Sequence, residues 1–186
     1  MKGNTTTKIA LSAMLASLTC VATMIIQIPS PATSGYVNLG DSFVIASAYL
    51  LGGIWGAGAA GLGSALADIL SGYTAYAPAT FVIKALMAIA FIVIFKALSK
   101  LNLIDALSSA LAAICSELIM IFGYFAYEAL ILGYGAAALG AVPANLIQGA
   151  VGAFVGVLLV LLFSKNKALS HVFSVFRKNH NDSQKQ

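Results

Sequence analysis

The chain has 186 residues, of which 60% are hydrophobic and only 9% are charged, and its mean hydropathy is +0.95. Soluble domains carry about 25% charged and about 45–50% apolar residues, so this composition excludes a soluble protein and indicates a single integral membrane domain. The net charge of +4 does not indicate nucleic-acid binding, because the basic residues form no motif and no basic face.

The apolar runs predict an all-α integral membrane bundle, since a spanning helix needs about 20 mainly apolar residues. Turn and capping residues delimit the runs, with Asp41 expected as the N-cap of the second helix and Asn102 or Asp105 opening the fifth. The bundle of about six helices is expected over 1–165, followed by a polar cytoplasmic tail at 166–186. The predicted helices are 8–28, 41–54, 56–72, 78–99, 104–132 and 142–164.

Two details of this arrangement stay open. The first run has the basic start of a signal peptide, but its spanning length and the lack of an A-x-A-like site favour a retained helix. The second and third helices are short and joined by a charge-free, glycine-rich stretch, so they form either a tight hairpin or a partly re-entrant pair. Small residues four apart in this stretch, and at Gly149/Ala153 and Gly152/Gly156, are typical of close helix packing in lipid.

The basic residues predict the orientation. With six helices both termini lie on one side, and nine of the ten Lys and Arg residues fall there, which makes that side cytoplasmic by the positive-inside rule. Lys84 is the exception. The nine are Lys2, Lys8, Lys96, Lys100, Lys165, Lys167, Arg177, Lys178 and Lys185.

Most of the remaining polar residues fall at the outer ends of the helices. Tyrosines for stacking and a few polar groups for orientation are typical of a small-molecule site, so we expect an aqueous pocket open to the outside. The inner half is nearly bare of polar groups, which predicts that the protein binds a ligand but cannot, alone, pass it through the membrane. The candidate ligand-binding residues are Tyr36, Asn38, Asp41, Asp68, Tyr73, Tyr76, Lys84, Tyr124, Tyr127, Glu128, Asn145 and Gln148.

Structural explanations compete with a binding role. The tyrosines could form an interfacial aromatic belt, although the cytoplasmic edge has only Trp55 as a clear anchor. Asp68 and Lys84 could form an ion pair, and so could Glu128 and Lys84, since ionisable groups in a membrane face a partner or a cavity. Glu117 lies about three turns before Glu128, near the same helix face.

Two long motifs stand in this part of the chain, "GYVNLGD" at Gly35–Asp41 and "GSALADxxSGYxxYAPATFxIK" at Gly63–Lys84. Here the sequence resembles the substrate-binding S components of energy-coupling factor (ECF) transporters, in the branch with riboflavin, hydroxymethylpyrimidine and pyridoxine S components. The resemblance covers all six predicted helices.

The resemblance implies a vitamin site near the outer face, with the 1–2 loop as a lid and helices 4–6 and the 3–4 loop as walls. It also implies docking on a transmembrane T subunit that carries two ATPases, and toppling in the membrane to deliver the vitamin. Docking in that family uses small residues four apart on helix 1. The strict AxxxAxxxA form is not intact here, and the corresponding residues are Ser12, Ala13, Ala16, Ser17 and Cys20.

The predicted function is therefore that of a vitamin-binding importer component in a prokaryotic plasma membrane. Hydroxymethylpyrimidine or pyridoxine is the expected ligand type, with riboflavin or another B vitamin, and a stand-alone secondary transporter, as alternatives; a structural or sensor role is a further one. No Walker motif, HExxH, GxSxG with a helical His or paired-Asp motif occurs, so neither an ATP site nor an enzyme is expected.

Cofactor and metal sites are not expected either. Cys20 and Cys115 lie far apart in apolar runs and are interpreted as packing residues. His171 and His180 fall in the polar tail, where a solvated surface is expected. The expected partners are the vitamin, the T subunit with its two ATPases, and the lipid bilayer.

Overall fold

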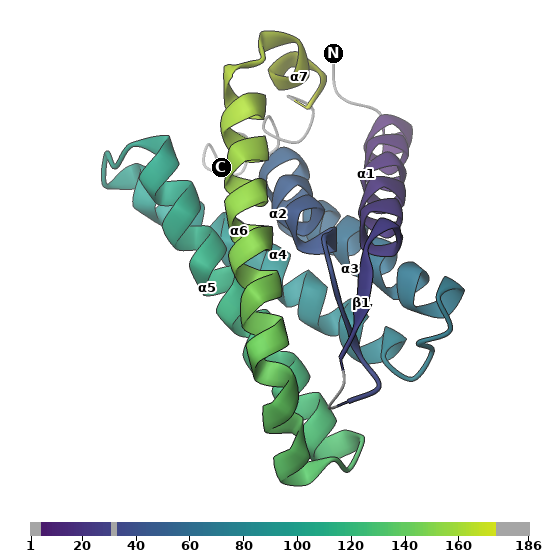
Figure 1. The fold of residues 1–186 in the computed structure, drawn as a ribbon. Coiled ribbons are helices and arrows are strands. Elements are labelled where there is room, and N and C mark those ends of the chain that lie inside the picture. The colour runs from purple at the N-terminus through teal and green to yellow at the C-terminus, as the bar shows by residue number, and fades with distance from the viewer. Residues whose placement is uncertain (1–4, 31–32, 174–186) are drawn as a thin grey trace, which may run out of the picture.

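The computed structural model describes residues 5–30 and 33–173, and within these it is an all-α bundle with one short β-hairpin (Figure 1). Lys2, Arg177, Lys178, His180 and Lys185 lie outside the described residues. The elements in chain order are α1 (Thr5–Ile25), β1 (Gln27–Pro29), β2 (Tyr36–Asn38), α2 (Gly40–Leu51), α3 (Gly53–Leu70), α4 (Ala77–Lys100), α5 (Asp105–Ala126), a π-helical turn (Tyr127–Ile131), a 3-10 helix (Gly135–Ala141), α6 (Val142–Lys165) and α7 (Lys167–Val172).

The predicted membrane bundle is confirmed, with one refinement. Over the described ranges, five helices are long and apolar enough to span a membrane, namely α1, α3, α4, α5 with its π-helical turn, and α6 with the preceding 3-10 helix. The sixth, α2, has 12 residues, which at about 1.5 Å per residue cannot cross a hydrocarbon core of about 30 Å. Val44, Ile45 and Ala48 on α2 are fully buried, so this helix forms the centre of the bundle.

The junction between α2 and α3 is a sharp break without a loop. Gly52 and Gly53 have φ angles of 64° and 42°, a left-handed region that glycine enters without steric penalty. The predicted N-cap role of Asp41 is wrong, because Leu39 occupies the cap position and α2 begins at Gly40. The Asp41 side chain turns into the bundle instead. The fifth predicted helix begins at Asp105, and Asn102, with a φ of 58°, lies in the turn before it.

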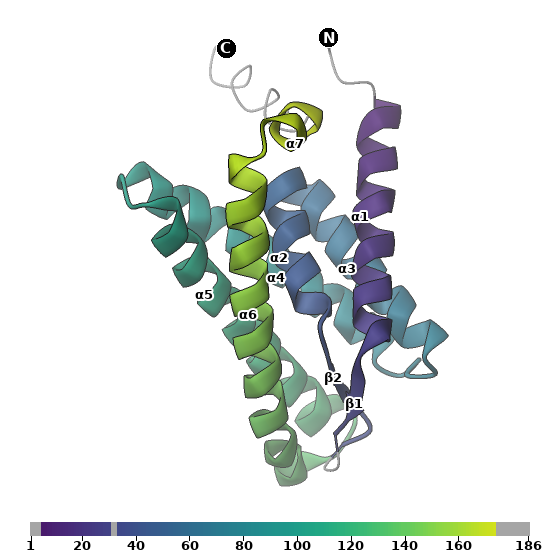
Figure 2. The ribbon, with the colours of Figure 1, turned by 45° about the horizontal axis from the view of Figure 1, so that its top comes forward.

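A β-hairpin replaces the end of the first predicted helix. Helix α1 ends at Ile25, and β1 pairs antiparallel with β2 in the register Gln27↔Asn38, Ile28↔Val37 and Pro29↔Tyr36. The two views place this hairpin toward one end of the bundle, beside the lower part of α6 (Figures 1 and 2). It therefore lies over the side where the polar residues were predicted to gather.

The elements divide between two ends of the bundle. The start of α1, the α4–α5 turn and the end of α6 lie toward one end, whereas the hairpin and the α5–α6 connection lie toward the other (Figures 1 and 2). Lys96 and Lys100 end α4, and Lys165 ends α6, so these basic residues lie away from the hairpin.

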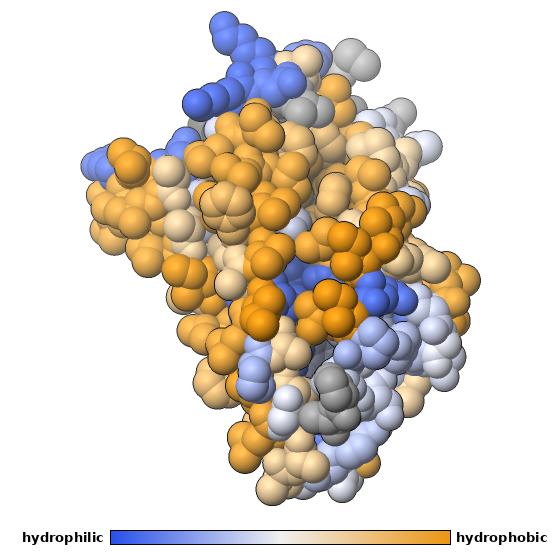
Figure 3. All heavy atoms as spheres, viewed as in Figure 1, coloured by the Kyte–Doolittle hydropathy of each residue, from blue (hydrophilic) through white to orange (hydrophobic). Residues whose placement is uncertain are grey.

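The outer surface of the bundle is apolar and the helices cross closely. Ile54 and Leu130 are each 81% exposed, as expected for side chains that face lipid. Figure 3 shows apolar flanks, and hydrophilic atoms between α6 and the hairpin. A Cβ atom at Gly63 would lie 2.3 Å from the backbone oxygen of Ala16. Helices α1 and α3 therefore touch backbone to backbone, as small residues in lipid permit.

Candidate functional site

A narrow pocket of about 380 Å³, partly open to solvent, lies between the hairpin and the ends of α3, α4, α5 and α6. That volume includes solvent space at the open mouth, and the room inside for the centres of water-sized molecules is only about 20 Å³, so the side chains nearly fill the pocket in this conformation. Seven of the twelve predicted ligand-binding residues are among its lining residues. The full lining is Ser30, Thr33, Gly35, Tyr36, Asn38, Asp68, Tyr76, Thr80, Tyr124, Glu128, Ala141 and Asn145.

The other five predicted residues lie just outside the lining. The ring of Tyr73 packs on that of Tyr36 at 4.4 Å between centroids, and the ring of Tyr127 packs on that of Tyr76 at 5.9 Å. These two tyrosines therefore support pocket rings. The remaining three, Asp41, Lys84 and Gln148, form a buried polar network.

The first wall of the pocket joins the hairpin to α3. The Tyr36 hydroxyl donates to Asp68 Oδ1 at 2.6 Å, and Gln27 Nε2 on β1 donates to Ser71 Oγ at 2.8 Å. Burial, reinforced by the Asp68 carboxylate, raises the pKa of Tyr36, which keeps this hydroxyl protonated and donating. The alternative of an Asp68–Lys84 ion pair is wrong, since the Lys84 ion pair goes to Asp41.

A second wall contains Glu128, which lies in the π-helical turn. Such single turns interrupt an α-helix, frequently at functional sites. Glu128 is 2% exposed, and its Oε1 accepts a hydrogen bond of 3.0 Å from the Tyr76 hydroxyl. Burial is the main cause that raises the pKa of Tyr76. The alternative of a Glu128–Lys84 pair is also wrong, because Lys84 reaches Asp41.

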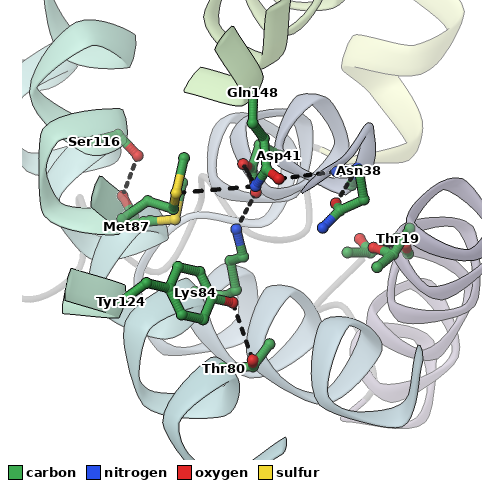
Figure 4. Close-up of polar contacts among 12 residues, drawn as sticks. Thr19, Asn38, Asp41, Thr80, Lys84, Met87, Ser116, Tyr124 and Gln148 are labelled. Carbon is green, nitrogen blue, oxygen red and sulfur yellow. Dashed lines mark hydrogen bonds and ion pairs between the residues drawn. The ribbon is translucent and has the colours of Figure 1, made fainter. Parts of the chain in front are cut away.

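A buried network lies beside the pocket and ties the hairpin to three helices (Figure 4). Lys84 Nζ on α4 forms an ion pair with Asp41 Oδ1 on α2. Gln148 on α6 donates from Nε2 to Asp41 Oδ2 at 2.6 Å, and its Oε1 accepts from the backbone N–H of Asn38 on β2 at 2.8 Å. The Lys84 ammonium also lies 5.3 Å from the centroid of the Tyr124 ring, which lines the pocket. The network is therefore continuous with the pocket wall.

Glu117 is an ionisable residue of this region that the candidate set omits. It is 4% exposed, and neither carboxylate oxygen has a hydrogen-bond partner among the described residues. A Cβ at Gly152 would lie 2.8 Å from Glu117 Oε1 and 2.8 Å from Asp41 Cβ, so that glycine of α6 leaves room for both carboxylates. An acid in the middle of an apolar helix was itself a signal for this position.

The lining residues missed from sequence are small or neutral. Thr80 is one helical turn before Lys84, and its Oγ1 hydrogen-bonds the Tyr124 hydroxyl at 2.9 Å. Helical spacing from Lys84 could have indicated it. The sequence gives no such signal for the other four lining residues, because only the fold of the hairpin and the 3-10 helix brings them to the pocket. These are Ser30, Thr33, Gly35 and Ala141.

A second concave surface, apolar and with about 430 Å³ of space for the centres of water-sized molecules, lies between α1 and α3. Of the five predicted docking residues, Ser12, Ala13 and Ala16 line it, whereas Ser17 is exposed and Cys20 buried on the same helix. We call this surface the α1–α3 groove. Its lining is Ile9, Ser12, Ala13, Ala16, Ile54, Trp55, Gly58, Ala59 and Leu62.

Residues 3–165 match the profile of the family described as "ECF-type riboflavin transporter, S component". The chain belongs to this family. The ECF S component family consists of membrane-embedded transport proteins and not of enzymes, and the five membrane-length helices agree with that location. The resemblance to ECF S components that the two sequence motifs carry is thereby confirmed at the level of the family.

A relative from Pyrococcus woesei, named "Uncharacterized protein in gap 3'region", is 48% identical over 64 residues. The match covers 34% of this chain and 43% of the relative, so less than half of that protein is shared. Within the described part of this S component, no group of three His, Cys, Asp or Glu residues is placed to hold a metal ion.

Proposed function

We propose that this S component captures a small heteroaromatic vitamin or precursor, of the hydroxymethylpyrimidine or pyridoxine type, in the pocket beneath the hairpin. The observation that carries the proposal is the pocket itself, whose lining combines the rings of Tyr36, Tyr76 and Tyr124 with hydrogen-bonding side chains. Aromatic faces with a few convergent polar groups suit a flat, polar heterocycle.

The pocket belongs to the outer face in this proposal. The basic residues at the ends of α4 and α6 lie at the opposite end of the bundle, and the positive-inside rule assigns that end to the cytoplasm. The hairpin acts as the lid, because it contributes Tyr36 and Asn38 to the lining and closes a narrow space.

Delivery requires partners in this proposal, namely a T subunit that carries two ATPases, as family membership implies. Proteoliposomes that hold the purified chain alone are expected to bind labelled ligand without accumulating it, and co-reconstitution with the partners and ATP is expected to produce uptake. Accumulation by the chain alone would instead support a secondary transporter.

The α1–α3 groove is the proposed docking surface for the T subunit. Ala13 is the residue to test, because it is exposed and lines the groove, whereas Ala16 is already buried against α3. Ala13→Trp would fill a surface where helix backbones need to approach closely. We expect it to abolish co-purification with the partners and uptake, while ligand binding stays unchanged.

Leu18→Trp is the matched control for this substitution. Leu18 is on the same helix and is 42% exposed, but it does not line the groove. The control variant is expected to assemble normally. Normal assembly of Ala13→Trp as well would remove the groove from the interface.

A further inference from the structure

The charge of the pocket restricts its ligand further than its shape does. The residues that line it include two carboxylates, Asp68 and Glu128. None of the described lining residues is Lys, Arg or His. The nearby ammonium of Lys84 is taken up by the Asp41 ion pair, and Lys84 itself does not line the pocket. The pocket therefore carries acidic groups without a lining base to neutralise them.

Both carboxylates are deeply buried, and only one oxygen of each has a hydrogen-bond partner among the described residues. Asp68 is 3% exposed and Glu128 is 2% exposed. One oxygen of each accepts a tyrosine hydroxyl, from Tyr36 and Tyr76 respectively. Asp68 Oδ2 and Glu128 Oε2 have no hydrogen-bond partner among the described residues. A buried polar atom without a partner is energetically unfavourable, and a buried charge even more so.

Ligand groups that donate hydrogen bonds or carry positive charge would relieve both carboxylates. An N–H or O–H donor satisfies the free oxygen, and a carboxylate beside a ring nitrogen favours the protonated, cationic form of that ring. The ring faces of Tyr36, Tyr76 and Tyr124 also attract cations, through the quadrupole of each aromatic ring. A phosphate or carboxylate on the ligand would instead meet like charge with no base in the lining.

We propose that the pocket selects cationic or protonatable nitrogen heterocycles that carry N–H or O–H donors, and rejects their anionic derivatives. Asp68 and Glu128 are the specificity-determining residues. This inference rests on the proposed function of the same pocket and deepens it, because it names the charge and donor pattern of the ligand. It assigns the free, unphosphorylated form of a vitamin as the ligand.

The test compares matched ligands on the purified full chain by equilibrium titration. Pyridoxine is compared with pyridoxine 5′-phosphate, and hydroxymethylpyrimidine with the analogue whose 4-amino group is replaced by an oxo group. For the pair whose parent compound binds, we expect the phosphate ester to bind at least about a hundredfold more weakly, or the oxo analogue at least about tenfold more weakly. Equal or tighter binding of the phosphate ester or the oxo analogue would overturn the inference and leave the binding function intact.

Variants separate ligand recognition from structural support. Glu128→Gln and Asp68→Asn keep the size of each side chain and remove its charge, and each is expected to weaken binding of the preferred ligand by about tenfold or more. Ser34→Ala, on the exposed part of the hairpin, is the control with unchanged affinity. Unchanged affinity in both acid variants would contradict the assignment. If none of the four compounds binds the unaltered chain, the proposed function fails rather than the charge selectivity.

Discussion

Lys84→Met is expected to lower the free energy of unfolding by about 3–5 kcal/mol, because it leaves the Asp41 carboxylate buried without its counterion. The side chains of Lys84 and Asp41 are 2% and 0% exposed, so water cannot replace the lost partner. Gln148 still donates to Asp41 Oδ2, but an amide does not neutralise a charge. Denaturant or thermal unfolding of the detergent-solubilised protein measures the loss.

The paired substitution Lys84→Met with Asp41→Asn is expected to recover most of that stability. Removal of both charges eliminates the uncompensated carboxylate, and neutral replacements of buried ion pairs are often well tolerated. Asp41→Asn alone should be milder than Lys84→Met, because Glu117 interacts electrostatically with Lys84 and leaves it a second carboxylate. Equal stability of Lys84→Met and the parent protein would contradict the ion pair.

Gln148→Met is expected to speed ligand release by about tenfold or more, because loss of the buried hydrogen bond to the lid corresponds to roughly 1–3 kcal/mol; the substitution also removes the hydrogen bond to Asp41. Gln148 holds the lid, since its Oε1 accepts the backbone N–H of Asn38 at 2.8 Å. Methionine has a similar length and cannot make this bond. Stopped-flow displacement of bound ligand gives the dissociation rate directly.

Ser34→Ala provides the control for the lid. Its Oγ hydrogen-bonds the Tyr134 hydroxyl at 2.7 Å, in an exposed contact between the hairpin and the α5–α6 connection. Exposed contacts of this kind contribute little net stability because water replaces them. The dissociation rate of Ser34→Ala should match that of the parent. A Gln148→Met rate as slow as this control would show that the hairpin does not depend on Gln148.

The helices could be predicted from sequence because composition alone decides which segments enter a membrane. The start of α4 was expected at residue 78 and lies at Ala77, and the end of α6 was expected at 164 and lies at Lys165. The hairpin was missed because its strands have three residues each, too few to show an alternating pattern. Pro29 and Pro31 favour extended backbone in the residue before each, which suits a loop as well as a strand.

The pocket was predictable as a set of residues and not as a set of contacts. Polar side chains near helix ends could be grouped by the side of the membrane they reach. The acid that pairs with Lys84 could not be predicted in this way. The choice among Asp41, Asp68 and Glu128 depends on how α2, α4 and the π-helical turn pack together. The pairing with Asp41 requires α2 to be the buried centre of the bundle.

The decisive experiment is calorimetric titration of the purified full chain in detergent, without any partner. We expect saturable binding of hydroxymethylpyrimidine or pyridoxine at one site per chain, and weaker binding in Glu128→Gln, whose carboxylate lines the pocket. Stoichiometric binding with the same affinity in Glu128→Gln, or binding of riboflavin alone, would contradict this account of the pocket and its ligand.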